Sequence, residues 1–289
     1  MKDYLKLIRV EQYVKNLFVL SPLFFGGAFS DWTLLFRTLL AFLAFAFAAS
    51  SIYIINDFFD INEDRAHPEK CTRPLASGAI GSRNALVLQV VLMLTSLVLS
   101  YWLSMDLFLV VCGYIGLNLL YSKWLKHIAI LDVNIIAAGF VLRLLAGTAV
   151  TGIELSVWIL LMTYLLALFL AIAKRRTDVV HAQNGKEVRK NIEGYNLAFV
   201  DTALGILASI VIVCYIFYCI SPENQRHYNS KWLYLSIIFV INGIFRYLKL
   251  ALVDGATASP TLIVLKDRFI QITIICWLVL MSYLLYGNR

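Results

Sequence analysis

Long apolar stretches separated by short polar segments set the pattern of this 289-residue chain. Nine apolar runs fall at about residues 17–30, 33–55, 84–104, 107–122, 129–150, 155–173, 195–220, 231–252 and 268–286. A helix needs about 20 mainly apolar residues to cross the hydrocarbon core of a bilayer. The pattern therefore predicts an all-α, polytopic membrane protein with about nine transmembrane helices. Because the first and fourth runs are short, eight spans with the first run lying in the membrane interface stay open as an alternative.

The polar segments alternate in character along the chain. Short segments poor in Lys and Arg alternate with longer basic ones, which we expect to form loops at 57–83, 122–128, 174–194 and 251–266. Of the 25 Lys and Arg residues, only Arg37, Arg226, Lys231 and Arg289 lie outside this basic side. Loops rich in Lys and Arg stay in the cytoplasm. We therefore expect the basic loops on the cytoplasmic side of the inner (plasma) membrane and the C-terminus outside.

The first sixteen residues are mixed and basic, without the apolar core or cleavage site of a signal peptide. We expect an amphipathic lead-in at the membrane surface over residues 1–16. Together with the apolar runs, this lead-in predicts one transmembrane domain over residues 1–289.

Composition supports the membrane class and narrows the partners. The chain is 61% hydrophobic and 15% charged, whereas soluble domains carry about 25% charged residues. The net charge of +7 sits in short loops, so it reflects orientation in the membrane, and we expect no nucleic acid partner. The five cysteines show no metal-ligand spacing and indicate reduced thiols.

A group of carboxylates follows the second apolar run, in the segment NDFFDINEDR. On a helix, the spacing of Asp57, Asp60 and Asp64 would place the three side chains along one face. A solvated acidic helix end explains this poorly, because the helix dipole disfavours negative charge at a C-terminus. Mg²⁺ prefers oxygen ligands and commonly bridges protein carboxylates to substrate phosphates. The pattern predicts that these aspartates and Asn56 hold Mg²⁺ against a diphosphate.

Basic residues follow the carboxylates at Arg65, Lys70 and Arg73. Such cations would neutralise the phosphate oxygens that the metal leaves free. His67, in the same segment, fits an ordinary loop residue at least as well as a ligand.

Two ionisable residues, Asp132 and Arg143, lie inside the apolar run 129–150. An ionisable side chain within a span is usually functional or paired. Arg143 keeps its proton, so it must face a partner or a wet cavity, and we expect it in the catalytic machinery. Asp132 would either orient Arg143 or another base, or contact the substrate.

Further polar residues gather near the ends of other runs. Arg9, Gln12, Lys15 and Asn16 form a cluster at the entry of the first run. The other candidates for substrate binding are Tyr121, Lys123, Lys126, Lys174, Arg175, Arg176, Asp178, Tyr195, Lys266 and Arg268. Membrane anchoring by the positive-inside rule is the alternative for each of these cations.

The segment NDFFDINEDR resembles the first aspartate-rich motif, NDxxDxxxD, of the UbiA superfamily of intramembrane prenyltransferases. The longer string NDFFDINEDRAHPEKCTRPLASG resembles the decaprenyl-phosphate phosphoribosyltransferase branch. Further similar strings are VKN, YSKWLK, DVNIIAAGFVLRLLAG, KRRTD and SPTLIVLKDR, and together they span nearly the whole chain. The resemblance implies an all-helical fold around a central cavity.

The chain departs from the superfamily at its second motif, which normally supplies more aspartates for a second magnesium ion. Here the position reads KRRTD, with one carboxylate and three cations. A more basic site suits the additional 5-phosphate of phosphoribosyl diphosphate. The resemblance therefore implies Mg²⁺-dependent transfer of 5-phosphoribose to a polyprenyl (decaprenyl) phosphate, with diphosphate released, in cell-wall synthesis.

Two other functions stay open. One is transfer of an isoprenoid chain to an aromatic acceptor, which shares the first motif but fits the single carboxylate Asp178 less well. The other is a transporter without chemistry, which predicts ionisable residues deep in several helices, whereas here they gather at one face. The sequence also leaves a homo-oligomer open.

Overall fold

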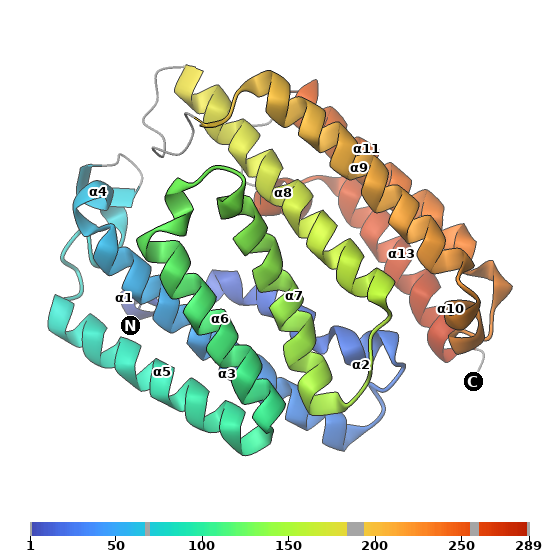
Figure 1. Cartoon of the computed structure of the whole chain (residues 1–289), viewed down its shortest axis with the longest axis horizontal. Helices are drawn as coiled ribbons and strands as arrows, with labels where there is room; N and C mark the ends of the chain where they lie inside the picture. Colours follow the sequence, from blue (N-terminus) through green and yellow to red (C-terminus); the bar gives the residue numbers. More distant parts are fainter. Residues whose placement is uncertain (1, 67–69, 184–193, 255–259, 288–289) are drawn as a thin grey trace. The chain divides into compact units, whose positions relative to one another are not determined.

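The computed structural model describes residues 2–66, 70–183, 194–254 and 260–287. Across these ranges all regular secondary structure is helical (Figure 1). This confirms the all-α fold class.

Among the described residues, eight helices are long and apolar enough to cross a membrane. They are Trp32–Phe59 (α3), Ser82–Leu103 (α5), Met105–Lys123 (α6), Leu131–Thr151 (α7), Val157–Gln183 (α8), Leu197–Ile220 (α9), Lys231–Val253 and Arg268–Tyr286 (α13). The seventh combines the 3-10 helix η5, Lys231–Ser236, with α11, Ile237–Leu252.

The first predicted run does not form one long helix. It consists of a 3-10 helix, η1 (Val10–Leu20), and the short α2 (Ser21–Phe25). Pro22 lies in the first turn of α2, where its missing N–H is tolerated. Gly26 ends the helix, so the chain turns before it reaches a spanning length.

Two of the predicted loops begin later than their polar composition indicates. α3 continues to Phe59, and α8 continues through the KRRTD segment to Gln183. Residues 174–183 contain no Pro or Gly, so nothing in the backbone interrupts the helix when the sequence turns polar. Shorter helices occupy parts of the predicted loops: α4 (Ile61–Ala66), η2 (Lys70–Thr72), η3 (Leu125–His127) and α12 (Pro260–Lys266). His67 and residues 184–193 lie outside the described residues.

The chain folds into two compact units, and α7 begins in the second and ends in the first. The first comprises Met1–Lys126 and Ala138–Leu155. Here α3 packs against α5, α6 and η1. Ala41, Ala48 and Ala49 are buried in its core, and small residues let membrane helices approach closely. The Ser96 hydroxyl reinforces the α3–α5 contact by donating to the Ala44 carbonyl at 2.7 Å.

The N-terminal segment of this unit lies directly against α7. A Cβ atom on Gly147 would come within 2.1 Å of the Val19 carbonyl oxygen and 2.8 Å of the Pro22 ring. Only glycine permits so close an approach of two backbones. The short helix α1 (Lys2–Leu7) buries Leu7 beside Ile54 of α3.

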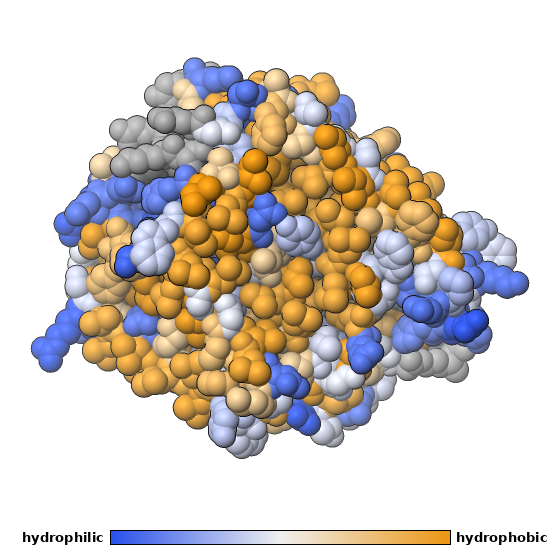
Figure 2. Space-filling model, in the orientation of Figure 1, coloured by the Kyte–Doolittle hydropathy of each residue, from blue (hydrophilic) through white to orange (hydrophobic). Residues whose placement is uncertain are grey.

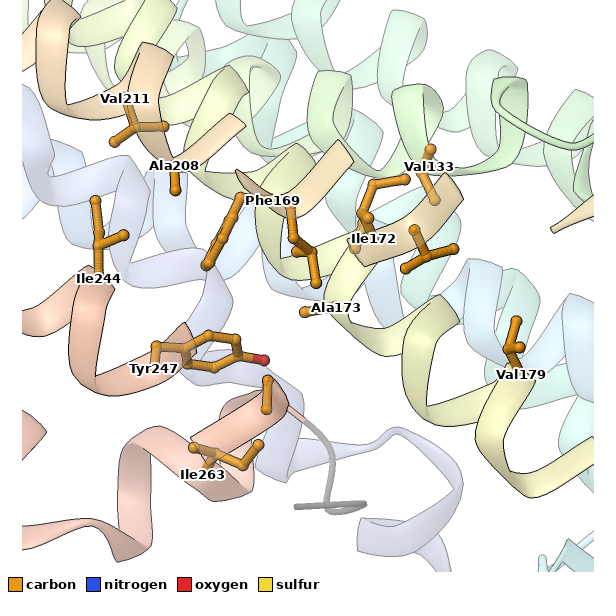
Figure 3. Close-up of a cluster of buried hydrophobic side chains, with 14 of the residues drawn as sticks. Val133, Phe169, Ile172, Ala173, Val179, Ala208, Val211, Ile244, Tyr247 and Ile263 are labelled. Carbon is orange, nitrogen blue, oxygen red and sulfur yellow. The ribbon is translucent and has the colours of Figure 1, made fainter. Parts of the chain in front are cut away.

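The second unit comprises His127–Ala137 and Ser156–Arg289. In it α9 packs against α8 and α11, and α11 packs against α13. Phe169 of α8 and Tyr247 of α11 meet edge to face in its core, with ring centroids 5.3 Å apart (Figure 3). The short α10 (Pro222–His227) joins α9 to η5.

The exterior of these helices is apolar, and apolar residues cover most of the face shown in Figure 2. On α5, for example, Val87, Leu94 and Val98 are each more than half exposed. Such a surface is solvated by lipid tails and not by water. The observed helices therefore fit a bilayer in both length and surface.

Candidate active site

The acidic segment spans a break between two helices. α3 ends at Phe59, Asp60 caps it with φ −96° and ψ 5°, and α4 begins at Ile61. The Asp64 amide still donates to the Asp60 carbonyl at 2.7 Å, so the two helices follow one another closely. The expectation of three carboxylates on one helix is therefore wrong in detail, because the backbone turns out of α-helical geometry at Asp60.

Two of the three carboxylates are buried and share one cation. Asp57 and Asp64 are each 2% exposed. Nη1 of Arg73 donates to Oδ1 of Asp57 at 3.1 Å and to Oδ2 of Asp64 at 2.6 Å. Because one nitrogen meets both oxygens, these carboxylates lie close enough to bind a single cation together.

The third carboxylate, Asp60, has its own partners. Nζ of Lys126 lies 2.5 Å from Oδ1, and the Asn56 amide donates to Oδ2 at 2.9 Å. Asn56 thus orients an aspartate in this structure, while its carbonyl oxygen could still ligate a metal. The structure brings together six of the residues singled out in the sequence, namely Asn56, Asp57, Asp60, Asp64, Arg73 and, from η3, Lys126.

Arg9 also belongs to this cluster, although the sequence placed it only among polar residues near the first run. Its Nη2 lies 2.5 Å from Oδ1 of Asp57, and its guanidinium lies over the Tyr53 ring, 4.7 Å from the centroid. Arg9 itself has a left-handed backbone, φ 53° and ψ 54°. Such a conformation costs a non-glycine residue about 1–2 kcal/mol, which the bond to a buried carboxylate offsets.

These side chains fit a magnesium ion that also binds substrate. Mg²⁺ is commonly held by one or two carboxylates and completed by water and phosphate oxygens. The paired carboxylates of Asp57 and Asp64 supply such a set of ligands. Among the described residues, no group of three or more His, Cys, Asp or Glu is arranged to hold a metal alone. An ion here would therefore depend on oxygens from a ligand.

Arg143 lies in the same unit, buried within α7 at 5% exposure. Its Nε donates to Oδ1 of Asn16 at 2.9 Å, and Nη1 donates to the Gly139 carbonyl at 2.6 Å. The guanidinium also lies 5.0–5.3 Å from the ring centroids of Phe45, Tyr114 and Phe140. Arg143 therefore does not pair with Asp132, and the groups that contact its guanidinium here are neutral.

Lys15 precedes the Asn16 that binds Arg143. Burial and, to a lesser extent, the positive charges of Arg143 and Arg9 together lower the pKa of Lys15 to about 8, against the opposing effect of Glu11. Lys15 is thus charged at neutral pH in a place that disfavours its charge. An anionic ligand beside such a lysine would stabilise its charged form.

Asp132 instead belongs to a buried network in the second unit. Its Oδ2 lies 2.8 Å from Nε of Arg175, and the Tyr195 hydroxyl donates to its Oδ1 at 2.7 Å. Nη1 of Arg175 donates to Asp178 at 2.7 Å. Asp132 and Arg175 are 0% and 1% exposed. The base that Asp132 orients is therefore Arg175, and the network ties α7 to α8.

The other cations of the KRRTD segment differ in their surroundings. Nε of Arg176 donates to Oδ1 of Asp201 at 2.7 Å. Lys174 is exposed. Two of the three cations expected to bind phosphate are therefore paired with carboxylates of the same unit.

The remaining candidates lie at helix ends. Arg65 is exposed and donates to the Ala76 carbonyl at 3.1 Å, and Lys70 is half-buried in η2. On α6, Tyr121 is half-buried, and the Lys123 ammonium lies over the Trp124 ring. Lys266 ends α12 and Arg268 begins α13, and both are exposed. Their roles in binding remain predictions.

Relatives of known type match this chain over nearly its whole length. A decaprenyl-phosphate phosphoribosyltransferase from Mycolicibacterium smegmatis is 34% identical over 285 residues, covering 95% of this chain and 89% of the relative. A decaprenyl-phosphate phosphoribosyltransferase from Corynebacterium glutamicum is 33% identical, covering 94% and 83%.

Solved structures share the fold at low sequence identity. A UbiA homolog from Archaeoglobus fulgidus, bound to DMAPP and Mg²⁺, superposes with a TM-score of 0.72 at 20% identity, covering 98% of this chain and 99% of the other. A UbiA homolog from Aeropyrum pernix gives 0.68 at 14% identity, covering 92% and 98%. The profile of the UbiA prenyltransferase family matches residues 18–257. The resemblance carried by the aspartate-rich motif is confirmed, and this multi-pass membrane protein belongs to the UbiA prenyltransferase family.

Proposed function

We propose that the protein transfers 5-phosphoribose from phosphoribosyl diphosphate to a polyprenyl phosphate and releases diphosphate. The observation that carries this proposal is the similarity to decaprenyl-phosphate phosphoribosyltransferases across 95% of the chain. The cluster of carboxylates and cations at the α3–α4 junction supports it, because a diphosphate bound with a metal needs both.

In this mechanism, Asp57, Asp60 and Asp64, with the Asn56 carbonyl, would hold Mg²⁺ together with oxygens of the donor diphosphate. The bound ion supplies positive charge where the leaving group becomes negative, the position at which charge stabilisation lowers a barrier most. Arg9, Arg73 and Lys126, which meet the carboxylates in this structure, would then turn to the diphosphate oxygens.

The acceptor reacts through its own phosphate. An acceptor oxygen forms a bond to C1 of the ribose as the bond from C1 to the diphosphate oxygen breaks, and the bonding electrons leave with the diphosphate. Because the acceptor phosphate is already an anion, the step needs no strong general base. Charge develops on the ribose ring as in other glycosyl transfers.

We place the reaction at the cytoplasmic face of the plasma membrane. The Lys- and Arg-rich segments lie on the same side of the spans as the acidic cluster in the sequence, and such segments stay in the cytoplasm. The polyprenyl chain would remain in the bilayer while its phosphate enters the protein.

Reconstitution in vesicles tests the proposal. Purified protein is incubated with Mg²⁺, polyprenyl phosphate and labelled phosphoribosyl diphosphate, and the extracted lipid is examined by mass spectrometry. We expect a polyprenyl phosphoryl-phosphoribose that does not form in EDTA. A parallel reaction offers a prenyl diphosphate and an aromatic acceptor. Product only in that reaction would identify an isoprenoid transferase and contradict the proposal.

A further inference from the structure

A second basic site lies in the first unit, deeper in the membrane than the acidic cluster. The Arg143 guanidinium lies beside Phe45 of α3, and at 1.5 Å per residue Phe45 is about 18 Å along α3 from Asp57. In the part of the chain that the structure describes, no carboxylate forms an ion pair with Arg143. A buried cation held only by neutral groups is costly within a span and usually serves a ligand.

Lys15 adds a second cation to this place. It is next to Asn16, whose side chain accepts a hydrogen bond from Arg143. The contact between Gly147 and Val19 fixes η1 against α7. Gly147 lies about one helical turn from Arg143 on α7, and Val19 lies about one turn from Asn16 on η1. Lys15 and Arg143 are thus held on two elements whose backbones touch.

We propose that Lys15 and Arg143 form an anion site for the phosphate of the lipid acceptor, separate from the carboxylates that take the donor. This assignment rests on the proposed function. A phosphate monoester at neutral pH carries up to two negative charges, which two cations neutralise, and its oxygens accept from guanidinium and ammonium groups. This site would take up the phosphate as the lipid enters, and the acceptor oxygen would then move to C1 of the ribose beside the acidic cluster before the new bond forms.

The surroundings favour a lipid phosphate over the 5-phosphate of the donor. Beside Lys15 on η1, Val14 and Leu17 are 46% and 49% exposed, so the segment faces the apolar phase. The rings of Phe45 and Phe140 flank the guanidinium. A lipid brings its phosphate to this depth with its own apolar anchor, whereas a free sugar phosphate must leave water to reach it.

Binding measurements on the full-length protein in detergent test the assignment. The probes are labelled polyprenyl phosphate, and phosphoribosyl diphosphate with Mg²⁺. Lys15→Met should weaken polyprenyl phosphate binding about tenfold or more, consistent with loss of one charge-assisted contact, and leave donor binding unchanged. Lys6→Met, at an exposed lysine of α1, is the matched control and should change neither. In the wild type, uncharged polyprenol should not compete.

A Lys15→Arg variant keeps a positive charge at this position over the whole pH range, so it distinguishes an effect of charge from a structural effect of Lys15. Arg143, which is buried in the fold, is left in place. As pH rises from 7 to 9, wild-type affinity for polyprenyl phosphate should fall, because Lys15, which faces Arg143, Arg9 and Glu11, loses its proton near pH 8. The arginine variant should keep its affinity. Loss of donor binding with intact acceptor binding in Lys15→Met would overturn the assignment. Failure of the wild type to bind the donor, with acceptor binding still dependent on Lys15, would instead refute the proposed function alone.

Discussion

Nε of Arg175 lies 2.8 Å from Oδ2 of Asp132, and both side chains are almost fully buried. The pair joins the start of α7 to α8, so it stabilises the second unit. Removing one partner of a buried ion pair typically costs about 3–5 kcal/mol, because the other charge is left without compensation. We expect Arg175→Met to lower the free energy of unfolding by about this amount, as measured by denaturation in detergent.

A double-mutant cycle is the control for this pair. Combining Arg175→Met with Asp132→Asn should recover part of the loss, because no buried charge is then left alone. If Asp132→Asn unfolds like the wild type yet binds no substrate, Asp132 acts on the substrate and the stabilising role is wrong.

Gly147 gives a second prediction about stability. A methyl group at this position would lie 2.1 Å from the Val19 carbonyl oxygen, so η1 must move. Gly147→Ala should therefore destabilise the protein by about 1–3 kcal/mol. Gly113→Ala on α6 is the matched control, since its Cβ would meet nothing within 4 Å. Because alanine favours helix more than glycine, this control should be neutral or stabilising by up to about 1 kcal/mol. Equal effects at both positions would contradict the close packing.

Arg73 and magnesium should substitute for one another. Arg73→Met leaves the buried carboxylates of Asp57 and Asp64 without their shared cation. In EDTA we expect a loss of about 1.5–3 kcal/mol, read as a lower melting temperature. Millimolar Mg²⁺ with phosphoribosyl diphosphate should raise the melting temperature of the variant more than that of the wild type. Arg83→Met, at an exposed arginine at the start of α5, should be within about 0.5 kcal/mol of wild type throughout.

Lys15 should make stability depend on pH. Its pKa is about 8 in the folded protein against 10.5 for an ordinary lysine. Between these values the unfolded chain binds more protons than the folded one, so stability rises with pH across this window. Lys15→Met lacks the buried charge and should be more stable than wild type at pH 7, by up to about 3 kcal/mol. Its advantage should fade between pH 8 and 10.5. A constant difference across that range would show that Lys15 is not held in a disfavoured charge state.

Local pattern sufficed to predict the helical class, the approximate spans and the acidic motif. Apolar runs report burial in lipid directly, and Asp57, Asp60 and Asp64 are close in sequence, so their spacing already places them together. Arg73 follows within the same polar segment and was also predicted. These features depend on helix geometry over a few turns and hardly at all on tertiary packing.

The features that the sequence did not predict depend on packing between segments that are distant in the chain. Arg9 meets Asp57 across 48 positions, and no periodicity links the two residues. The cations of KRRTD were candidates for phosphate binding or for membrane anchoring, yet Arg175 and Arg176 pair with Asp132 and Asp201 in the structure. The sequence predicted that Arg143 faces a partner or a wet cavity, and in the structure aromatic rings and neutral oxygens contact its guanidinium.

The carboxylates at the α3–α4 junction are central to the account, and binding of labelled phosphoribosyl diphosphate as a function of Mg²⁺ concentration tests them most directly. The wild type should bind the donor only when Mg²⁺ is present. Asp57→Asn should lose this dependence and most of the affinity, whereas Glu63→Gln, on an exposed α4 carboxylate outside the NDxxDxxxD set, should bind like the wild type. Donor binding by Asp57→Asn with unchanged affinity and magnesium dependence would contradict the account.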